Sequence, residues 1–211
     1  MKTIITIQHT QAVHHTNGMV GSWTDWELTG LGKERAENIG KRLSGEIGEK
    51  PCKIYCSDLT RTKQTAEPLL RYLGTNAEYR TDLREIFSGA ASIGKSSEWL
   101  IKNRAWSPDV ISIDNKPFDD AESIREAYNR AAIFRDEILA ADNDIIIVVS
   151  HAGILPLFFA AWLGWDAEAL LSFEFYGAAG GVSFLQETDD GKRVISRLND
   201  MSYSGEDYRL V

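Results

Sequence analysis

Residues 144–153 read DIIIVVSHAG, an apolar run that ends in serine and histidine. The run is uninterrupted and rich in β-branched side chains, which predicts a strand that is covered on both faces. A second apolar stretch follows at 154–163 and predicts a helix. A doubly covered strand that passes directly into a helix is typical of the parallel sheets of α/β proteins.

The same succession of strand and helix occurs twice nearer the N-terminus. A strand expected at 3–7 ends in Gln8-His9-Thr10, and a strand expected at 53–56 ends in Ser57-Asp58. Helices are expected at 32–45, with Thr29 as N-cap and Gly45 as stop, and at 59–72, with Ser57-Asp58 as caps and Gly74 as stop. The remaining expected elements are a strand at 78–80, helices at 96–104 and 120–140, and a hairpin of strands at 181–186 and 193–198.

Alternating strands and helices predict an α/β fold, a three-layer α/β/α sandwich around a mostly parallel central sheet. The length of 211 residues suits a single domain over residues 1–211. The stretch at about 86–119 has the least regular pattern, which predicts a lid-like insertion.

The charge and hydropathy of the chain exclude several classes of partner. Lysine and arginine total 23 against 31 aspartates and glutamates, a formal net charge of −8. An acidic surface of this kind disfavours nucleic acid and anionic lipid. Because no apolar run approaches membrane length and the N-terminus lacks the core of a signal peptide, we expect a cytoplasmic protein that does not bind a membrane.

Two cysteines, Cys52 and Cys56, lie on the same face of the expected second strand. A disulfide between positions i and i+4 of one strand is geometrically implausible. No other ligands at zinc-like spacing accompany them, and the two adjacent histidines His14 and His15 do not have the i, i+4 spacing of a helical metal site. The sequence therefore predicts two reduced core thiols and no metal site.

Reactive polar residues follow three of the expected strands. They are His9 after the first, Ser57-Asp58 with Arg61 after the second, and His151 after the strand at 144–149. The carboxyl ends of parallel strands meet at one edge of a sheet, where ligand sites form. Two histidines at matching strand ends, with an arginine at a third, indicate a functional site rather than two isolated structural histidines.

Longer motifs extend this pattern along the chain. They are QHT at 8–10, WTDWELTGLG at 23–32, SDLTRTKQTA at 57–66, LRE at 83–85, ES at 122–123, SHAG at 150–153 and LND at 198–200. In this order they resemble the histidine phosphatase superfamily, in its phosphoglycerate mutase-like branch. The resemblance covers nearly the whole chain and is most specific at 57–66. It departs from the family at Gln8, where the family has arginine.

The resemblance implies a phosphatase, a phosphomonoester hydrolase that acts through a phosphohistidine intermediate on His9. It implies that Arg61 binds two phosphate oxygens, that His151 donates hydrogen bonds to the same oxygens, and that Glu85 protonates the leaving oxygen. No cofactor and no metal ion are expected, because protein cations take the place of a metal. A surface carboxylate paired with Arg84 is the alternative for Glu85.

Four further residues are expected to bind substrate: Gln8, His15, Asn17 and Ala152. Gln8 carries no charge, and the loss of a charge-assisted pair in a desolvated site costs about 2–4 kcal/mol, so reduced activity is expected. A protonated His15 or His14 turned inward would restore the charge, and solvated loop histidines are the alternative.

The expected partner is a small phosphorylated substrate, and a homodimer is left open. Three alternatives to a simple hydrolase remain. They are a phosphoglycerate mutase-like phosphotransferase, a non-catalytic protein that binds a phosphorylated ligand, and an enzyme retuned by Gln8 toward a less charged ester.

Overall fold

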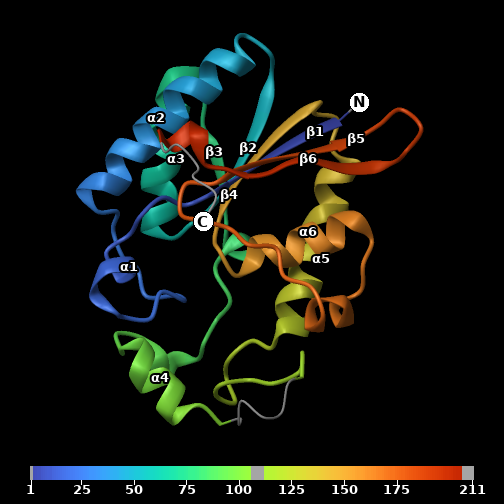
Figure 1. The fold of residues 1–211 in the computed structure, drawn as a ribbon. Helices are drawn as coiled ribbons and strands as arrows, with labels where there is room; N and C mark the ends of the chain where they lie inside the picture. The colour runs from blue at the N-terminus through green and yellow to red at the C-terminus, as the bar shows by residue number, and fades with distance from the viewer. Residues whose placement is uncertain (1, 106–111, 206–211) are drawn as a thin grey trace.

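A computed structural model describes residues 2–105 and 112–205 and shows an α/β fold around one six-stranded sheet (Figure 1). The strands are β1 (Lys2–Gln8), β2 (Cys52–Ser57), β3 (Ala77–Arg80), β4 (Ile145–Ser150), β5 (Val182–Glu187) and β6 (Arg193–Asp200), in the order β3-β2-β4-β1-β5-β6. The first four of that order pair in parallel, and β5 and β6 are added antiparallel. The expected α/β class with a mostly parallel sheet is confirmed.

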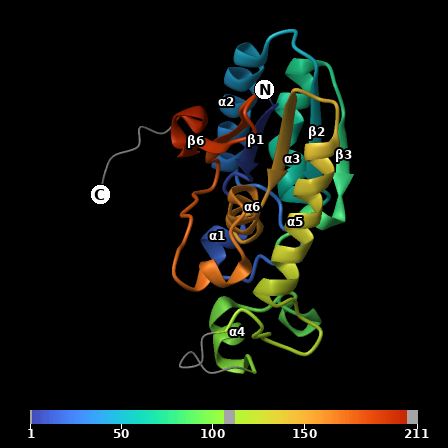
Figure 2. The same ribbon diagram turned by 90° about the vertical axis from the view of Figure 1, so that its right-hand side faces the viewer.

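Helices cover both faces of the sheet (Figure 2). The helices α2 (Gly30–Ile47) and α3 (Thr60–Leu73) lie on one face, and α5 (Ile124–Ala140) and α6 (Ile154–Leu163) lie on the other. The alternation within β4 accounts for this, because Ile147 and Val149 enter the core beneath α2 and α3, whereas Ile146 and Val148 enter the core beneath α5 and α6. The strand is therefore buried on both faces.

Two expected helix ends are corrected by the structure. Gly45 does not end α2, which continues to Ile47 because that side chain is buried in the core, and Gly48 closes the helix with a φ of 61°. Neither Ser57 nor Asp58 caps α3, because both side chains are engaged elsewhere. The expected cap at Thr29 is confirmed, since its side chain accepts a hydrogen bond from the Gly32 N–H.

The third long helix begins later than expected. The structure starts α5 at Ile124 rather than residue 120, because Ser123 and Glu126 form a capping box. The expected stop at Gly74 is confirmed by its left-handed conformation after α3. A four-residue helix, α1 (His14–Asn17), was not expected, because its residues lack an apolar repeat.

The described part of the expected lid region contains a short 3-10 helix at Ala90–Ser92 and the short helix α4 (Ser97–Asn103), and α4 lies beyond the carboxyl ends of the parallel strands (Figures 1 and 2). Residues 106–111 of this region lie outside the described residues. The segment on the N-terminal side of α4 is tied to the loop after β1, since the Val20 N–H donates to the Lys95 carbonyl and the Ser97 N–H donates to the Gly18 carbonyl.

The two cysteines are free thiols, as expected, and burial raises the pKa of the Cys56 thiol to about 12. Cys52, at the start of β2, is only partly buried. Within the described residues, no helix is both long enough and apolar enough to cross a bilayer.

Candidate active site

The carboxyl ends of β1, β2 and β4 bring His9, Ser57 and His151 to one edge of the sheet. The first turn of α3 adds Arg61. His9, Arg61 and His151 are no more than 2% exposed. The ring centroids of His9 and His151 are 5.1 Å apart with an edge-to-face orientation. The structure thus brings together the three residues that the strand ends predicted.

His9 holds a defined tautomer. Its Nδ1 lies 2.8 Å from the Thr10 carbonyl oxygen, which can only accept, so the ring proton is on Nδ1. Burial, and after it the Arg61 charge, keep the pKa of His9 well below its usual range. A neutral ring protonated on Nδ1 leaves a lone pair on Nε2, and this is the form that a nucleophile requires.

Arg61 is anchored against this lone pair. Its Nε donates to the His9 Nε2 at 3.3 Å, and its terminal nitrogens donate to the Thr24 carbonyl at 3.0 Å and the Ser22 carbonyl at 2.7 Å. Burial lowers the pKa of Arg61 to about 10, so the guanidinium stays charged at neutral pH. The two terminal nitrogens retain further N–H donors that can face an anion.

His151 is oriented by Ser57, whose hydroxyl lies 2.8 Å from the His151 Nε2. Burial, and after it the Arg61 charge, hold the pKa of His151 well below its usual range, so the ring is neutral. When the Ser57 hydroxyl donates to Nε2, the proton of His151 is on Nδ1. That Nδ1 is buried and has no hydrogen-bond partner among the described residues. It is a donor available to an anion at the strand ends.

Glu85 accepts the Ile86 N–H at 2.8 Å and the Gly153 N–H at 3.0 Å. A Cβ at position 153 would lie 2.3 Å from a Glu85 carboxylate oxygen, so glycine is required there. The alternative of a pair with Arg84 is wrong, because both oxygens of Asp58 hold Arg84 at 2.6 Å. The Glu85 carboxylate therefore lies against Gly153, in the loop that follows His151.

The histidines of α1 both turn toward His9. The ring centroid of His15 is 5.3 Å from that of His9 in a stacked orientation, and the His14 centroid is 5.8 Å away. Burial, and after it His15, lower the pKa of His14 to about 3, and burial, followed by the Arg61 charge, lowers the pKa of His15. Both shifts favour the neutral ring at pH 7, so neither histidine is expected to add a positive charge beside His9 in the substrate-free protein.

The proximity of these three imidazoles was not predicted from spacing. Each of His9, His14 and His15 offers one ring nitrogen, and these nitrogens lie within 4.8 Å of one another. The sequence placed His14 and His15 side by side without the spacing of a helical metal site, and it could not show that α1 folds them onto His9.

The remaining expected substrate-binding residues differ in position. Gln8 is nearly buried and lies against Gly177, where a Cβ would be 2.6 Å from its side-chain oxygen. Among the described residues, the Gln8 side chain makes no hydrogen bond with His9, Arg61 or His151. Asn17 is exposed and accepts the Met19 N–H at 2.9 Å. Ala152 is exposed and lines the cavity described next.

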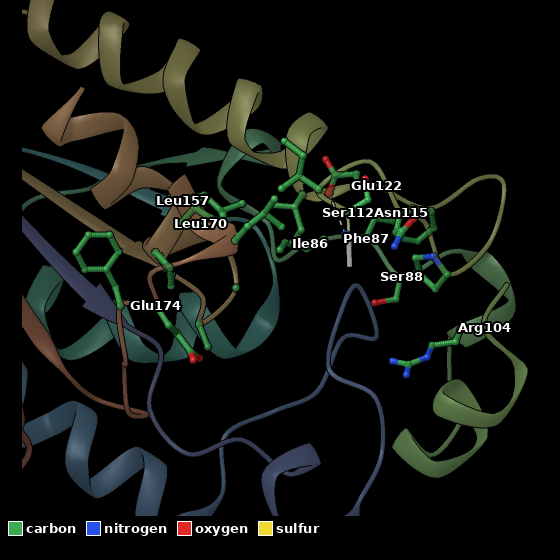
Figure 3. Close-up of a pocket in the computed structure, with 18 of the residues that line it drawn as sticks. Ile86, Phe87, Ser88, Arg104, Ser112, Asn115, Glu122, Leu157, Leu170 and Glu174 are labelled. Atoms are coloured by element: carbon green, nitrogen blue, oxygen red, sulfur yellow. Dashed lines mark hydrogen bonds between the residues drawn. The ribbon is translucent and has the colours of Figure 1, made fainter. Parts of the chain in front are cut away.

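A cavity of about 620 Å³ lies next to the site and includes Ile86 and Leu157 in its lining (Figure 3). Ala152 and Gly153 lie at one end, and the predicted lid supplies Phe87, Leu100 and Ile101. The lining is mostly aliphatic and aromatic. Its charged residues include Glu122, whose carboxylate is paired with Arg130 at 2.8 Å. The cavity suits the apolar part of a ligand whose reacting oxygen lies next to Glu85.

Sequence reasoning missed Ser22 and the role of Ser57. Ser22 has a positive φ of 34°, and its hydroxyl donates to the Ile86 carbonyl and accepts the Ser88 N–H. Its carbonyl also accepts a hydrogen bond from Arg61, so one residue joins the loop after β1, the segment that begins at residue 86 and the Arg61 side chain. No local signal marks Ser22. Ser57 was identified from its place at a strand end, but as a helix cap and not as a partner of His151.

The sequence model of the histidine phosphatase superfamily (branch 1) matches residues 4–201. The chain belongs to the histidine phosphatase superfamily. It is a phosphatase of that superfamily, as the motifs predicted. This histidine phosphatase is 27% identical to "Phosphoserine phosphatase 1" of Hydrogenobacter thermophilus, over 99% of this chain and 97% of that protein. It is 25% identical to the "Adenosylcobalamin/alpha-ribazole phosphatase" of Escherichia coli, over 79% of this chain and 82% of that protein.

Solved structures of the superfamily share the fold of this histidine phosphatase. The alpha-ribazole phosphatase from Shigella flexneri superposes with a TM-score of 0.79 at 22% identity, covering 94% of this chain and 96% of that one. A mycobacterial glucosyl-3-phosphoglycerate phosphatase gives a TM-score of 0.78 at 19% identity, covering 94% of this chain and 98% of that one. At these identities the likeness concerns the fold alone.

Proposed function

We propose that this histidine phosphatase hydrolyses a small phosphomonoester through a phosphohistidine on His9. The single observation that carries the proposal is the Nε2 lone pair of a neutral, buried His9, which the guanidinium of Arg61 contacts at 3.3 Å. A nucleophile and a fixed cation at one point are what phosphoryl transfer requires.

In the first step, the His9 Nε2 attacks phosphorus and the bond from phosphorus to the leaving oxygen breaks. The free N–H groups of Arg61 and the Nδ1–H of His151 donate to the nonbridging oxygens, where negative charge is concentrated. Glu85, held by the Gly153 N–H, gives its proton to the leaving oxygen. The product alcohol then leaves.

In the second step, Glu85 takes a proton from a water molecule whose oxygen attacks phosphorus. The bond between phosphorus and the His9 Nε2 breaks, inorganic phosphate forms, and His9 returns to its neutral state. The hydrogen bond from His9 Nδ1 to the Thr10 carbonyl keeps the ring orientation through both steps. No step requires a metal ion, since Arg61 and His151 supply the positive and donor groups.

We propose that Gln8 makes this enzyme weaker toward simple phosphomonoesters than a relative with arginine at that position. Gln8 lies against Gly177 and lines a small cavity that shares Pro156 and Phe175 with the large one. It therefore offers an amide dipole beside the leaving group instead of a charge on the phosphate. His15 and Asn17 remain proposed substrate contacts at the opposite side, and Ala152 borders the leaving group.

The substrate that the cavity fits best is a phosphomonoester with an apolar leaving group. The relatives named above act on phosphoserine and alpha-ribazole phosphate, as their names state. Aliphatic and aromatic residues of the predicted lid and α6 line the cavity, so an apolar alcohol would be buried there without polar contacts. A cytoplasmic location, a lid function for residues 86–119 and a homodimer remain predictions.

Hydrolysis is favoured over phosphotransfer, because the open cavity gives water access to the phosphoenzyme. A panel of phosphoserine, phosphoglycerate and aryl and branched alkyl phosphates, assayed by release of inorganic phosphate in EDTA, tests the proposal. We expect turnover throughout in EDTA, with KM falling as the leaving group becomes more apolar. Loss of turnover in EDTA, restored by one metal, would contradict it. Exchange of phosphate between a bisphosphate and a monophosphate would instead identify a mutase. Binding of a ligand without turnover would identify a binding protein.

A further inference from the structure

Three imidazoles, those of His9, His14 and His15, lie together after the end of β1. The rings of His14 and His15 lie 4.1 Å apart and both face the ring of His9. One nitrogen from each ring lies within 4.8 Å of the other two. The proposed hydrolysis uses His9 as the nucleophile and His15 as a substrate contact, but it gives no reason for His14 to lie beside both rings.

The nitrogens of this group are available to a Lewis acid. His9 is protonated on Nδ1 toward the Thr10 carbonyl, which leaves its Nε2 lone pair. The Nε2 edge of the His14 ring lies against Gly21. The Nδ1 of His14 is buried and has no hydrogen-bond partner among the described residues. A buried ring nitrogen without a partner is a common sign of a missing water or ion. His15 has only a 3.2 Å contact from the Ala12 N–H to its Nδ1, which a stronger bond can replace.

We propose that His9, His14 and His15 form a site for a divalent transition-metal ion of the zinc class, and that the bound ion blocks the nucleophile. Three neutral imidazoles with an open fourth position are a set of ligands that Zn²⁺ prefers. Zn–N bonds of about 2.0–2.1 Å place tetrahedral nitrogens roughly 3.3 Å apart, so the group must contract by up to roughly 1.5 Å. His14 and His15 lie on a four-residue helix in a loop, where such a movement is accessible.

The charge around the group predicts what fills the fourth position. Arg61 lies 3.3 Å from the His9 Nε2 and repels a dication, although the carboxylates of Glu85 and Asp25 act on the same guanidinium with the opposite sign. An anionic oxygen ligand between the ion and Arg61 removes the repulsion. Inorganic phosphate, held by Arg61 on one side and by the ion on the other, has this chemistry. Phosphate is therefore expected to strengthen metal binding.

Blocking follows from the shared atom, and this part rests on the proposed function. The lone pair of the His9 Nε2 cannot bind the ion and attack phosphorus at the same time. The site is therefore inhibitory, in contrast to the zinc sites of metallohydrolases, in which the ion activates water. The metal site itself depends only on the three rings.

Titration with Co²⁺ alone, followed by visible absorption, and with Zn²⁺ alone, followed by calorimetry, tests the site without any assay of activity. The wild-type chain is expected to bind one ion and to show the intense bands of tetrahedral Co²⁺, with tighter binding in inorganic phosphate. His14→Asn should weaken binding by at least about tenfold, since even outer ligand partners contribute that much. Cys52→Ser is the matched control, because this partly buried thiol lies at the opposite end of β2 and should not affect binding.

His15→Asn is the second variant and should weaken binding in the same way, with circular dichroism to show that each variant is folded. Unchanged binding in both folded variants, or loss of binding in Cys52→Ser, would overturn the site. In the activity arm, His14→Asn should keep its turnover without metal and need at least about tenfold more Zn²⁺ for inhibition. Binding to an active enzyme without inhibition would overturn the blocking, whereas an inactive enzyme that still binds Co²⁺ at the three rings would refute only the proposed function.

Discussion

The Nε of Arg61 lies 3.3 Å from the Nε2 of His9, so a guanidinium is fixed beside the lone pair of the proposed nucleophile. Two backbone carbonyls, those of Ser22 and Thr24, hold the other end of the guanidinium. Phosphoryl transfer depends mainly on positive groups that are already in place around the equatorial oxygens. In the proposed mechanism, the loop after β1 therefore contributes through its backbone, because its carbonyls orient Arg61.

Replacement of this arginine separates charge from geometry. Arg61→Lys keeps one charge but loses the planar fork, and we expect kcat/KM to fall by about 100-fold or more, which corresponds to about 3 kcal/mol. Arg71→Lys is the matched control, because its ion pair with Glu37 is exposed on the surface and should not affect turnover. Steady-state kinetics on one aryl phosphate measure both. An Arg61→Lys enzyme within threefold of the wild type would show that the fork is not needed.

Glu85 is tested through the basicity of the leaving group. Glu85→Gln retains the shape of the side chain but cannot give a proton, so kcat should fall by about 100-fold or more for alkyl phosphates and far less for 4-nitrophenyl phosphate. The reason is that nitrophenolate leaves without protonation. Glu49→Gln, on the exposed end of a loop, serves as control. An equal loss on both substrates would place Glu85 in another role.

The proposed effect of Gln8 on activity is tested by introducing arginine at that position. We expect Gln8→Arg to raise kcat/KM on simple phosphomonoesters by about tenfold or more if the fork reaches the phosphate. Because His15 is neutral, it does not compensate, and the effects of Gln8→Arg and His15→Ala should add within about 0.5 kcal/mol. Strong non-additivity would mean that His15 is charged in the substrate complex. Near-zero rates in every variant would favour a binding protein, and a gain on simple phosphates with a loss on the native substrate would favour retuning.

The buried histidines predict how stability changes with pH. Burial is the first cause that lowers the pKa values of His9 and His151 below the unfolded value of 6.5, so the unfolded chain takes up protons that the folded chain does not. Stability is therefore full above pH 6.5 and is lost as pH falls below it. These two residues should lower the free energy of unfolding by about 2–3 kcal/mol between pH 7.5 and 5.5.

Urea denaturation at the two pH values measures this loss, and His151→Asn should reduce it by about half. The half-exposed His14 and His15 add less, because solvent screens them. A free energy of unfolding that is constant or higher at pH 5.5 would contradict the neutral, buried state of these rings.

The fold was largely predictable because its signals are local. The signals for β4 and α6 come from residues that are neighbours in the sequence. The bounds of α6, 154 and 163, were expected for this reason. The helix ends at Gly45 and Asp58 were wrong because tertiary contacts decided them. Ile47 finds a place in the core, and Asp58 binds Arg84 from a distant segment.

The site residues that lie at strand ends were predictable from the sequence, and those that loops contribute were less predictable. His9, Arg61 and His151 follow from strand position, and the family resemblance supplied Glu85. The approach of His14 to His9 and the hold of Ser22 on Arg61 depend on the path of the loop after β1, which contains no periodic pattern. Such contacts leave no mark in the composition of the loop itself.

The most direct test of the account is the covalent state of His9 during turnover. Rapid quench with 4-nitrophenyl phosphate, followed by digestion and mass spectrometry at alkaline pH, should find a phosphoryl group on His9 that is stable to alkali and lost in acid. His9→Ala should form no adduct and show no turnover. Turnover of His9→Ala near that of the wild-type enzyme, or an adduct on another residue, would contradict the phosphohistidine mechanism.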